Sequence, residues 1–458
     1  MASLLTPVFD NFMKQAPLAV MMGVLMENVC GGDQIDEIFE ETASQQYTRD
    51  LQFSTVADLL SCVVFDRSPS IGAAYQSSHE AMEVSRKSIY NKLNGVEPAV
   101  SEALVEQTAG SFEAIIGKLD ARLPSLLPGY RVRILDGNHL SASEHRLKEL
   151  RTVAAAPLPG KSLVVFEPST KLATTVIACE DGHAQERALL SEVLRLVDAD
   201  DLWIADRNFC TTAFLTAIDR VGACFLVRQH AGLTGTLQGE RIHMGRCATG
   251  EVYEQAMTLQ DPQTDEAVTL RRISIELDKP VRGGQRELHL LSNVPTVDAS
   301  AAVLADLYRK RWRIETMFQE LTETLCCEIK PLGYPRAALL AFSLAVVAYN
   351  VIAVIKASLR TVHGSENVEQ NVSGYYIALE ISSTYGGMMI AVPEEHWSVF
   401  RDQTPTRIAA VLKKLAANAK LAKYQKHPRG PKKPKPKRIV GNSPHVATSR
   451  ILEQRKSK

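Results

Sequence analysis

Two aspartates stand directly after apolar, strand-like runs of the sequence. Asp136 follows YRVRIL, and Asp206 follows DLWIA. Hard divalent ions such as Mg²⁺ take oxygen ligands, and two-metal phosphoryl transfer needs carboxylates from separate elements. Singly, such an aspartate is more often a turn or cap residue, but the two together, at the ends of neighbouring strands, favour a metal site. His139 and His145 lie nearby and could assist proton transfer or touch DNA, although loop histidines are usually only polar.

A third carboxylate comes from the charged segment DLYRKRWRIETMFQELTETL, residues 306–325, whose spacing is helical. With Tyr308 set at 0°, Arg311 lies at about 300° and Glu315 at about 340° around the helix axis. The other two glutamates fall at about 120° and about 60°, off this stripe. We therefore select Glu315, which Arg311 could pair with while holding a phosphate beside it. The competing interpretation is an ordinary surface pair, which is common and contributes little.

The elements that would position these acids follow an α/β order. Strands are predicted at residues 130–140, 162–168, 172–182, 201–209 and 223–228, with helices at 184–197 and 211–222. Three strands, a helix, a strand, a helix and a strand predict an α/β fold in which the strands before Asp136 and Asp206 are neighbours. After short alternating strands, helix is expected again from about residue 300 through Leu325.

Changes in composition divide the chain into five predicted parts. They are a helical N-terminal domain (1–125), the first part of an α/β core (126–229), a β-rich insertion (230–297), the rest of the core with C-terminal helices (298–410), and a basic Pro/Lys-rich tail (411–458). In the first part, VSRKSIYNKLNG predicts a short helix that ends at Gly95. This helix could place Arg86 and Lys92 on DNA, although a merely solvated face is the commoner outcome.

Charge and composition narrow the possible functions. The net charge is zero, but 15 Lys and Arg against one acid lie in residues 411–458, which leaves residues 1–410 near −14. A basic tail on an acidic body predicts a polyanionic partner or a solvated tail. The eight cysteines form no C-x-x-C pair, and no phosphate-binding loop for ATP is present. We expect no secretion signal, and we interpret the uncharged run 337–355 as a buried core helix rather than a membrane span.

The same residues resemble the signature of a transposase family. Y-x2-R-x3-E, which begins at Tyr308, is similar to the Y-x2-R-x3-E-x6-K signature of DDE transposases of the insertion-sequence-four family. Asp-Gly-Asn at 136–138 and Asp-Arg-Asn-Phe at 206–209 resemble that family's two aspartate motifs. The resemblance covers about residues 130–350, and the three motifs occur in the family's order.

The resemblance implies a fold, a reaction and a set of partners. The fold would be a ribonuclease-H-like catalytic core, a mixed five-stranded sheet with flanking helices, interrupted by the β-rich insertion and preceded by the helical N-terminal domain. Asp136, Asp206 and Glu315 would be catalytic and would hold two Mg²⁺ ions, with Mn²⁺ as a substitute. A homodimer in the bacterial cytoplasm would carry out cut-and-paste transposition of an insertion sequence on transposon-end and target DNA, without a nucleotide cofactor or a membrane.

The residues expected to contact DNA include one departure from the family pattern. Tyr308 and Arg311 match it, but its Lys falls at Thr322, which has no charge and can donate only a neutral hydrogen bond. Arg207 and Asn208 follow the second aspartate and are also expected to contact DNA. The departure at Thr322 leaves a second hypothesis, a catalytically inactive or domesticated DNA-binding protein derived from a transposase.

Overall fold

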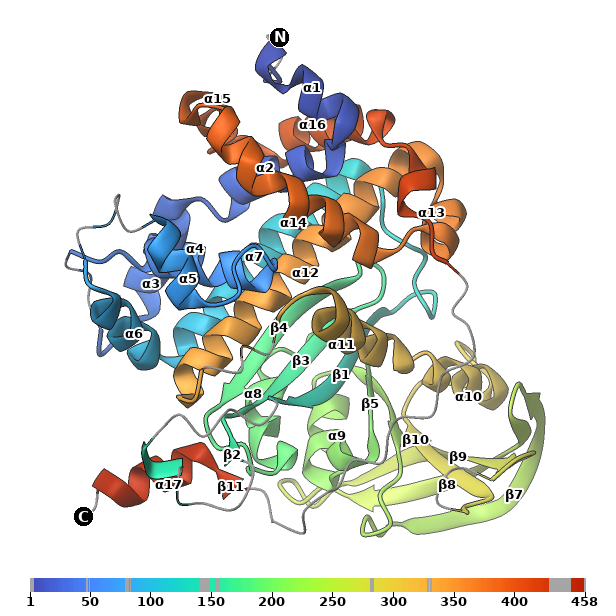
Figure 1. The fold of residues 1–458 in the computed structure, drawn as a ribbon. Coiled ribbons are helices and arrows are strands. Elements are labelled where there is room, and N and C mark those ends of the chain that lie inside the picture. The colour runs from blue at the N-terminus through green and yellow to red at the C-terminus, as the bar shows by residue number, and fades with distance from the viewer. Residues whose placement is uncertain are drawn as a thin grey trace.

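The fold was analysed in a computed structural model of the whole chain. The structure describes residues 4–46, 48, 50–78, 82, 84–140, 148–150, 152, 157–280, 284–327, 329, 332–427 and 446–456. His145 and most of the Pro/Lys-rich stretch of the tail therefore lie outside the described residues. Figure 1 shows helices from both ends of the chain gathered on one side of a large sheet.

Both ends of the chain contribute to the helical part, and α12 (Pro335–His363) is its central helix. The N-terminal helices are α1 (Asp10–Gln15), α2 (Pro17–Val29), α3 (Gly32–Thr42), α4 (Phe53–Val64), α5 (Ile71–Ser78), α6 (Arg86–Gly95) and α7 (Pro98–Leu119). The C-terminal helices are α13 (Ser365–Asn371), α14 (Gly374–Ala391), α15 (Glu394–Ser398), α16 (Pro405–Asn418) and α17 (Thr448–Lys456). Helices α2, α4, α6, α7 and α16 all pack against α12. The short helix predicted to end at Gly95 is confirmed as α6.

Helix α12 is long and apolar enough to cross a membrane, and it is the one such helix among the described residues. Its most apolar stretch is nevertheless 94% buried inside the fold. The polar Asn350 in its middle is fully buried, and its side-chain amide exchanges two hydrogen bonds of 2.9 Å with the backbone of Ala173. The polar interruption in the apolar run thus joins the helix to an edge strand, which fits a core helix.

Within the described residues, the chain has an α/β fold built on one mixed sheet of nine strands. In spatial order these are β4 (Leu172–Cys179), β3 (Lys161–Glu167), β1 (Arg131–His139), β5 (Asp201–Ala205), β6 (Cys224–Arg228), β10 (Glu287–Ser292), β9 (Ala267–Leu277), β8 (Gly250–Gln260) and β7 (Thr236–Cys247). Strands β1, β5 and β6 are parallel to one another, and the other neighbouring strands are antiparallel. The remaining strands, β2 (Pro157–Leu158) and β11 (Val446–Ala447), pair with each other.

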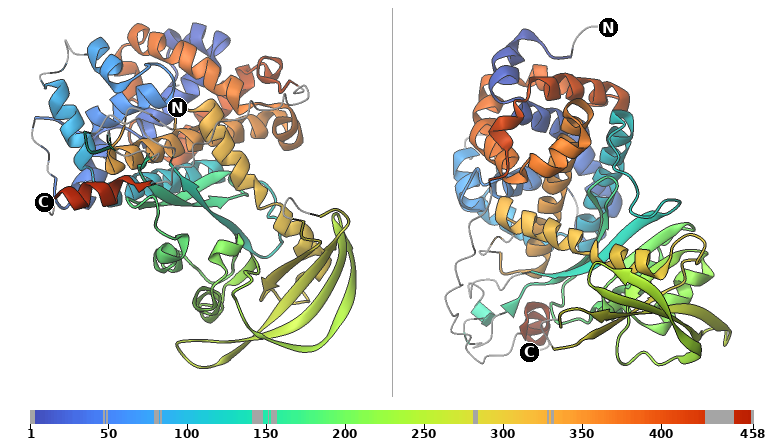
Figure 2. Two further views of the ribbon diagram at one scale, coloured as in Figure 1. Left: turned by 60° about the horizontal axis from the view of Figure 1, so that its bottom comes forward. Right: turned by 90° about the vertical axis from the view of Figure 1, so that its right-hand side faces the viewer.

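The prediction of a separate five-stranded core sheet is not confirmed, because the β-rich segment continues the sheet. Strand β10 pairs with the free side of β6, so that Leu290 stands opposite Arg228 and Ser292 opposite Leu226. An edge strand offers unpaired backbone groups to any extended segment, and this pairing satisfies them. Figure 2 shows β7–β10 projecting from the rest of the molecule as a curved lobe.

Side chains on the two faces of the sheet enter two different cores. Val132 and Ile134 of β1 join the large core with α7 and α12, whereas Leu135 joins a smaller core on the other face. That second face is covered by α8 (Leu190–Leu194) and α9 (Thr212–Arg220), which lie below the sheet in Figure 1. Because side chains alternate along a strand, Asp136 faces the same side as Ile134, toward the helical part.

The segment around Glu315 is two helices rather than the one continuous helix predicted through Leu325. Helix α10 (Ala301–Arg309) ends before α11 (Trp312–Thr324) begins, and hydrogen bonds between residues three apart tighten the turn. Helix α10 packs against β7, β8 and β9, whereas α11 packs against β1, α12 and α14. Helical periodicity does not record that two halves of a segment pack on different partners, so the break is absent from the pattern.

The boundary predicted between residues 410 and 411 falls inside α16 (Pro405–Asn418). Ile408, Leu412 and Leu415 of α16 are fully buried against the helical core. The composition of the segment does not show this short apolar stripe, because it records the excess of Lys and Arg over acids in residues 411–458 and not the spacing of the apolar side chains. Beyond the stretch that is not described, β11 and α17 return to the sheet side of the molecule (Figure 1).

Candidate active site

Strand register places the two aspartates side by side. In the parallel pair of β1 and β5, Leu135 stands opposite Ala205, so the next residues, Asp136 and Asp206, are lateral neighbours. Each aspartate comes two residues after an isoleucine of the large core, Ile134 or Ile204. Side chains two residues apart share a face of the sheet, so both aspartates face the helical part. Strand β1 continues past Asp136 to His139, within the predicted range 130–140, because the neighbouring strand β3 goes on pairing with it.

Glu315 reaches the same place through Arg311. The Arg311 guanidinium donates from Nη1 to Asp136 Oδ2 at 2.7 Å and from Nη2 to Glu315 Oε1 at 3.0 Å. Arg311 is only 8% exposed, the Asp136 side chain 19% and the Glu315 side chain 39%. The backbone of Arg311 stays right-handed helical, so the predicted stripe survives the break between α10 and α11. The residues selected from three separate segments therefore converge.

Charge and burial act against each other at this place. Burial first, and then the Asp206 and Glu315 carboxylates, raise the pKa of Asp136 to about 6, while the Arg311 guanidinium and the Gly137 N–H oppose the rise. Burial lowers the pKa of Arg311, but Tyr308 and the three carboxylates together raise it above its usual value. Burial and mutual repulsion thus disfavour the ionised carboxylates, and the positive charge of Arg311 partly compensates for their negative charge.

A further carboxylate, which the sequence reading missed, lies beside the two aspartates. Asn208 donates from Nδ2 to Glu186 Oε2 at 3.1 Å, and a Cβ atom added to Gly137 would lie 2.3 Å from Glu186 Oε1. Glycine at position 137 therefore leaves the space that Glu186 occupies. Glu186 begins a short 3-10 helix in the connection after β4, and no motif in the sequence distinguishes it. Asp206 itself caps the next 3-10 turn by accepting from the Arg207 N–H.

The other residues predicted to bind DNA differ in their solvent exposure and in the hydrogen bonds that they already make. The Tyr308 ring is almost buried, and burial raises the pKa of its hydroxyl far above the usual value. The Thr322 side chain is exposed, but its hydroxyl donates to the carbonyl of Phe318 in its own helix. Arg207 is exposed beside Asp206. Their contacts with DNA stay predictions.

On α6, the two predicted DNA contacts point to different surroundings. Arg86 is exposed in the first turn of the helix. Lys92 turns inward instead: its amine donates to the carbonyl of Leu51 at 2.9 Å and lies 4.4 Å from the centre of the Phe39 ring. Burial lowers the pKa of this amine. Of the two, Arg86 is the better placed for a phosphate.

The oxygen atoms of Asp136, Asp206 and Glu315 are suitable ligands for a hard divalent cation, because all three side chains are carboxylates. Within the described part of the chain, no three acidic, histidine or cysteine side chains are arranged close enough to hold a metal ion as they stand. The Arg311 guanidinium occupies the space between Asp136 and Glu315. A metal ion held by these carboxylates would therefore replace Arg311 as the cation among them.

Comparison with known proteins shows a match between the central part of the chain and one protein family. Residues 127–351, just under half of the chain, match the family described as transposase DDE domain, and the matched span contains all three carboxylates. None of the curated proteins matches the chain. Among solved structures, the chain is similar to a cryo-EM structure of the piggyBac transposase synaptic complex with hairpin DNA, at 10% identity and a TM-score of 0.39, over 87% of each chain. Transposase DDE domains generally use divalent metal ions. The match of residues 127–351 to a transposase DDE domain thus supports a transposase, an enzyme that cleaves DNA and transfers its strands.

Proposed function

We propose that the enzyme moves an insertion sequence by Mg²⁺-dependent cut-and-paste transposition and belongs to the insertion-sequence-four family. The observation that carries this proposal is the convergence of Asp136, Asp206 and Glu315 from two parallel strands and one helix. The strands β4, β3, β1, β5 and β6 are in keeping with the ribonuclease-H-like core that the family implies. Tyr308, Arg311 and Glu315 carry the family's spacing.

In this mechanism the three carboxylates, Asp136, Asp206 and Glu315, would hold the metal ions. A pair of divalent ions bound there would supply activation of water or of a DNA 3′-hydroxyl and stabilisation of the leaving oxygen. With a pKa of about 6, Asp136 is largely ionised at neutral pH and is ready to ligate a cation. Arg311, once released from Asp136 and Glu315, would hold a phosphate of the DNA beside the reacting one. Tyr308, which is almost buried beside Arg311, would flank that phosphate.

Further proposals concern the DNA and the assembly. Arg207 and Asn208 beside the second aspartate would contact the DNA near the cleavage point, and Arg86 on α6 would contact the transposon end. The N-terminal helices would recognise the ends, and the basic C-terminal segment would add salt-sensitive affinity. Joining two ends requires two active sites, so the working form would be a homodimer, in the bacterial cytoplasm.

The test of this function uses isosteric changes of the carboxylates. Asp136→Asn, Asp206→Asn and Glu315→Gln should each abolish Mg²⁺-dependent cleavage of DNA that carries the element's ends, while a DNA mobility-shift assay shows binding unchanged. Matched changes of Asp198 and Glu192, which lie away from the site, should leave cleavage intact. Full cleavage by any one of the three variants would refute the assignment.

A second candidate is a transposase-derived protein that binds DNA without cutting it. The observation that favours it is Thr322, whose hydroxyl is taken by its own helix where the family carries a Lys. If the wild type binds end DNA but does not cleave it, and Thr322→Lys restores cleavage, this second candidate is correct. Cleavage by the wild type excludes it.

A further inference from the structure

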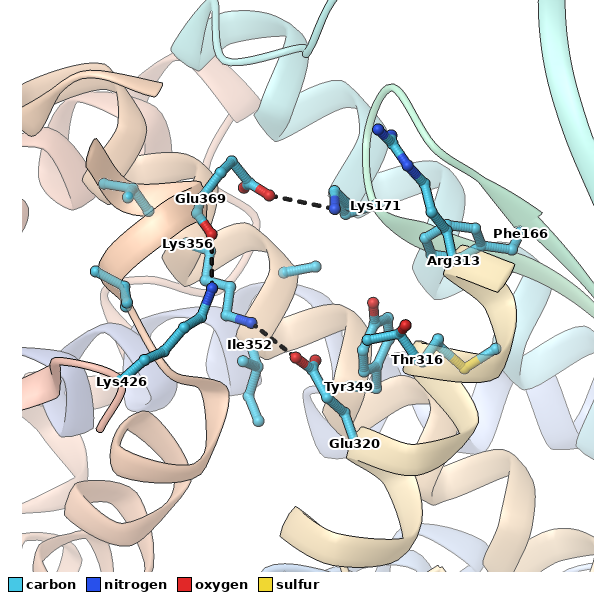
Figure 3. Close-up of a pocket in the computed structure, with 14 residues that line it drawn as sticks. Phe166, Lys171, Arg313, Thr316, Glu320, Tyr349, Ile352, Lys356, Glu369 and Lys426 are labelled. Atoms are coloured by element: carbon cyan, nitrogen blue, oxygen red, sulfur yellow. Dashed lines mark hydrogen bonds and ion pairs between the residues drawn. The ribbon is translucent and has the colours of Figure 1, made fainter. Parts of the chain in front are cut away.

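A cavity of about 210 Å³ lies on the far side of α11 from Glu315. Four cationic side chains line it: Lys171 from the turn between β3 and β4, Arg313 from α11, Lys356 from α12, and Lys426 near the C-terminal end of the helical part. In Figure 3, Lys356 and Lys426 reach in from one side, and Lys171 and Arg313 lie on the other. Elements distant in sequence thus bring four positive charges to one small space.

The carboxylates of the cavity neutralise only part of this charge. Lys171 Nζ lies 3.2 Å from Glu369 Oε2, and Lys356 Nζ lies 3.3 Å from Glu320 Oε1. Lys426 donates to the main-chain carbonyl of Glu369 at 2.6 Å, which is a neutral partner. Two acids therefore face four cations around the cavity.

Two further facts increase the positive excess. The Glu369 carboxylate is shared with the buried Arg360, whose Nη1 lies 2.9 Å from Glu369 Oε1. The Arg313 side chain makes no hydrogen bond or ion pair within the part of the chain that the structure describes, and its backbone N–H donates to the carbonyl of Lys310. Burial lowers the pKa of Lys171, Glu369 opposes this shift, and Arg313 and Lys356 lower the pKa further, so the positive groups are close enough to repel one another. A bound anion would relieve that repulsion.

The size and surroundings of the cavity limit what the anion can be. Pockets for whole drug-sized ligands have volumes of about 300–1,000 Å³, so this one suits a single phosphate group. A second cavity of about 510 Å³ adjoins it, shares Thr316, Glu320 and Lys426 with it, and is lined by Tyr375 and Tyr376. Exposed aromatic rings next to a cationic groove are how proteins hold successive bases and phosphates of a nucleic-acid strand.

Gly374 lines the second cavity next to the pair of Lys356 and Glu320. A Cβ atom at Gly374 would lie 3.1 Å from Lys356 Nζ and 3.5 Å from Glu320 Oε2, so a side chain there would displace the end of the Lys356 side chain by a few tenths of an ångström. The residues of α11 that line the first cavity recur at three and four positions. Glu315 lies roughly 150° around the helix from them. A phosphate in this cavity is therefore distant from the one that is cleaved.

We propose that the cavity between α11, α12 and α13 binds a backbone phosphate of DNA outside the cleavage point, held by Lys171, Arg313, Lys356 and Lys426. A nucleotide next to that phosphate lies over the second cavity, against Tyr375. The inference rests on the proposed function only in taking DNA as the source of the phosphate.

The experiment measures DNA binding in EDTA, where no cleavage takes place. Arg313→Ala is the main variant, because Arg313 makes no ion pair whose loss would disturb the fold. Neutralising one phosphate contact lowers the slope of log K against log salt by about 0.9 for duplex DNA. Fluorescence anisotropy with a duplex of arbitrary sequence should show this smaller slope for Arg313→Ala. It should show the wild-type slope for Arg313→Lys and for the control Arg195→Ala, an exposed arginine on the opposite face of the sheet.

A second measurement separates DNA from a small phosphate compound. Inorganic phosphate should raise the melting temperature of the wild type more than chloride of equal ionic strength does, and Arg313→Ala should lose this difference. A phosphate effect with an unchanged DNA slope would overturn the assignment to DNA, and an unchanged slope with no phosphate effect would overturn the phosphate site altogether. Both measurements stand apart from cleavage, so an enzyme that fails to cut would refute the proposed function and leave this result untouched.

Discussion

Substitution of Arg311 should show whether its guanidinium occupies the position that a metal ion would take between Asp136 and Glu315. In the structure its guanidinium joins Asp136 and Glu315 and is itself 8% exposed. Breaking a buried ion pair from one side costs about 3–5 kcal/mol. Glu315 is more than a third exposed and adds little, and Asp136 can take up a proton, so the lower end applies. We expect Arg311→Ala to lower the free energy of unfolding by about 3 kcal/mol in EDTA at neutral pH.

The metal affinity should change in the opposite direction. In the wild type an incoming cation must displace the guanidinium, whereas in Arg311→Ala it meets two unpaired carboxylates. The free energy that the wild type loses in that displacement is bounded by the same 3 kcal/mol or so, and about 1.4 kcal/mol is tenfold in affinity. The dissociation constant for Mn²⁺ should therefore fall by up to about 100-fold in the variant. Titration calorimetry with MnCl₂ and urea unfolding with and without the metal measure both quantities.

Arg133 supplies the matched control. It lies on the same strand as Asp136, is 7% exposed, and pairs with Asp201 at 3.1 Å and Asp198 at 3.4 Å. Arg133→Ala should destabilise the fold about equally with and without metal. A metal affinity of Arg311→Ala that is equal to or weaker than that of the wild type would refute the idea that Arg311 occupies the place of the cation.

Three further predictions follow from burial and steric contact. Because burial raises the pKa of Asp136 from 3.8 to about 6, ionisation of Asp136 destabilises the metal-free fold as the pH rises from 4 through 6. In EDTA at pH 8, Asp136→Asn should therefore have a free energy of unfolding up to about 3 kcal/mol higher than the wild type in urea unfolding. This gain should vanish near pH 4. Asn350→Leu leaves the buried N–H and C=O of Ala173 unpaired and should cost about 3 kcal/mol in urea unfolding, whereas an unchanged midpoint would show that α12 does not depend on this link. A Cβ atom at Gly250 would lie 1.9 Å from the Glu276 carbonyl oxygen across the β8–β9 pair, so Gly250→Ala should cost about 1–3 kcal/mol and speed amide hydrogen exchange in those strands while exchange in β1 and β5 stays as it was.

Sequence patterns predicted most of the local elements around the site and selected three of its acids as candidates. Apolar runs predicted the strands before Asp136 and Asp206, because a strand buried on both faces needs apolar side chains on both. Helical spacing selected Glu315 among the glutamates of its segment, because residues three and four apart share a face whatever the helix packs on. These signals are local and belong to the chain before it folds.

What only the tertiary structure decided was which partner each element meets. The backbone groups at a strand edge are the same for every extended segment. Side-chain periodicity therefore predicts neither that β10 pairs with β6 nor that Leu135 stands opposite Ala205. The same holds for Arg311, whose spacing showed that it could reach Glu315 but not that it would also hold Asp136. The cationic cavity is the extreme case, because its four charges come from four separate segments and meet only when the helices pack on the sheet.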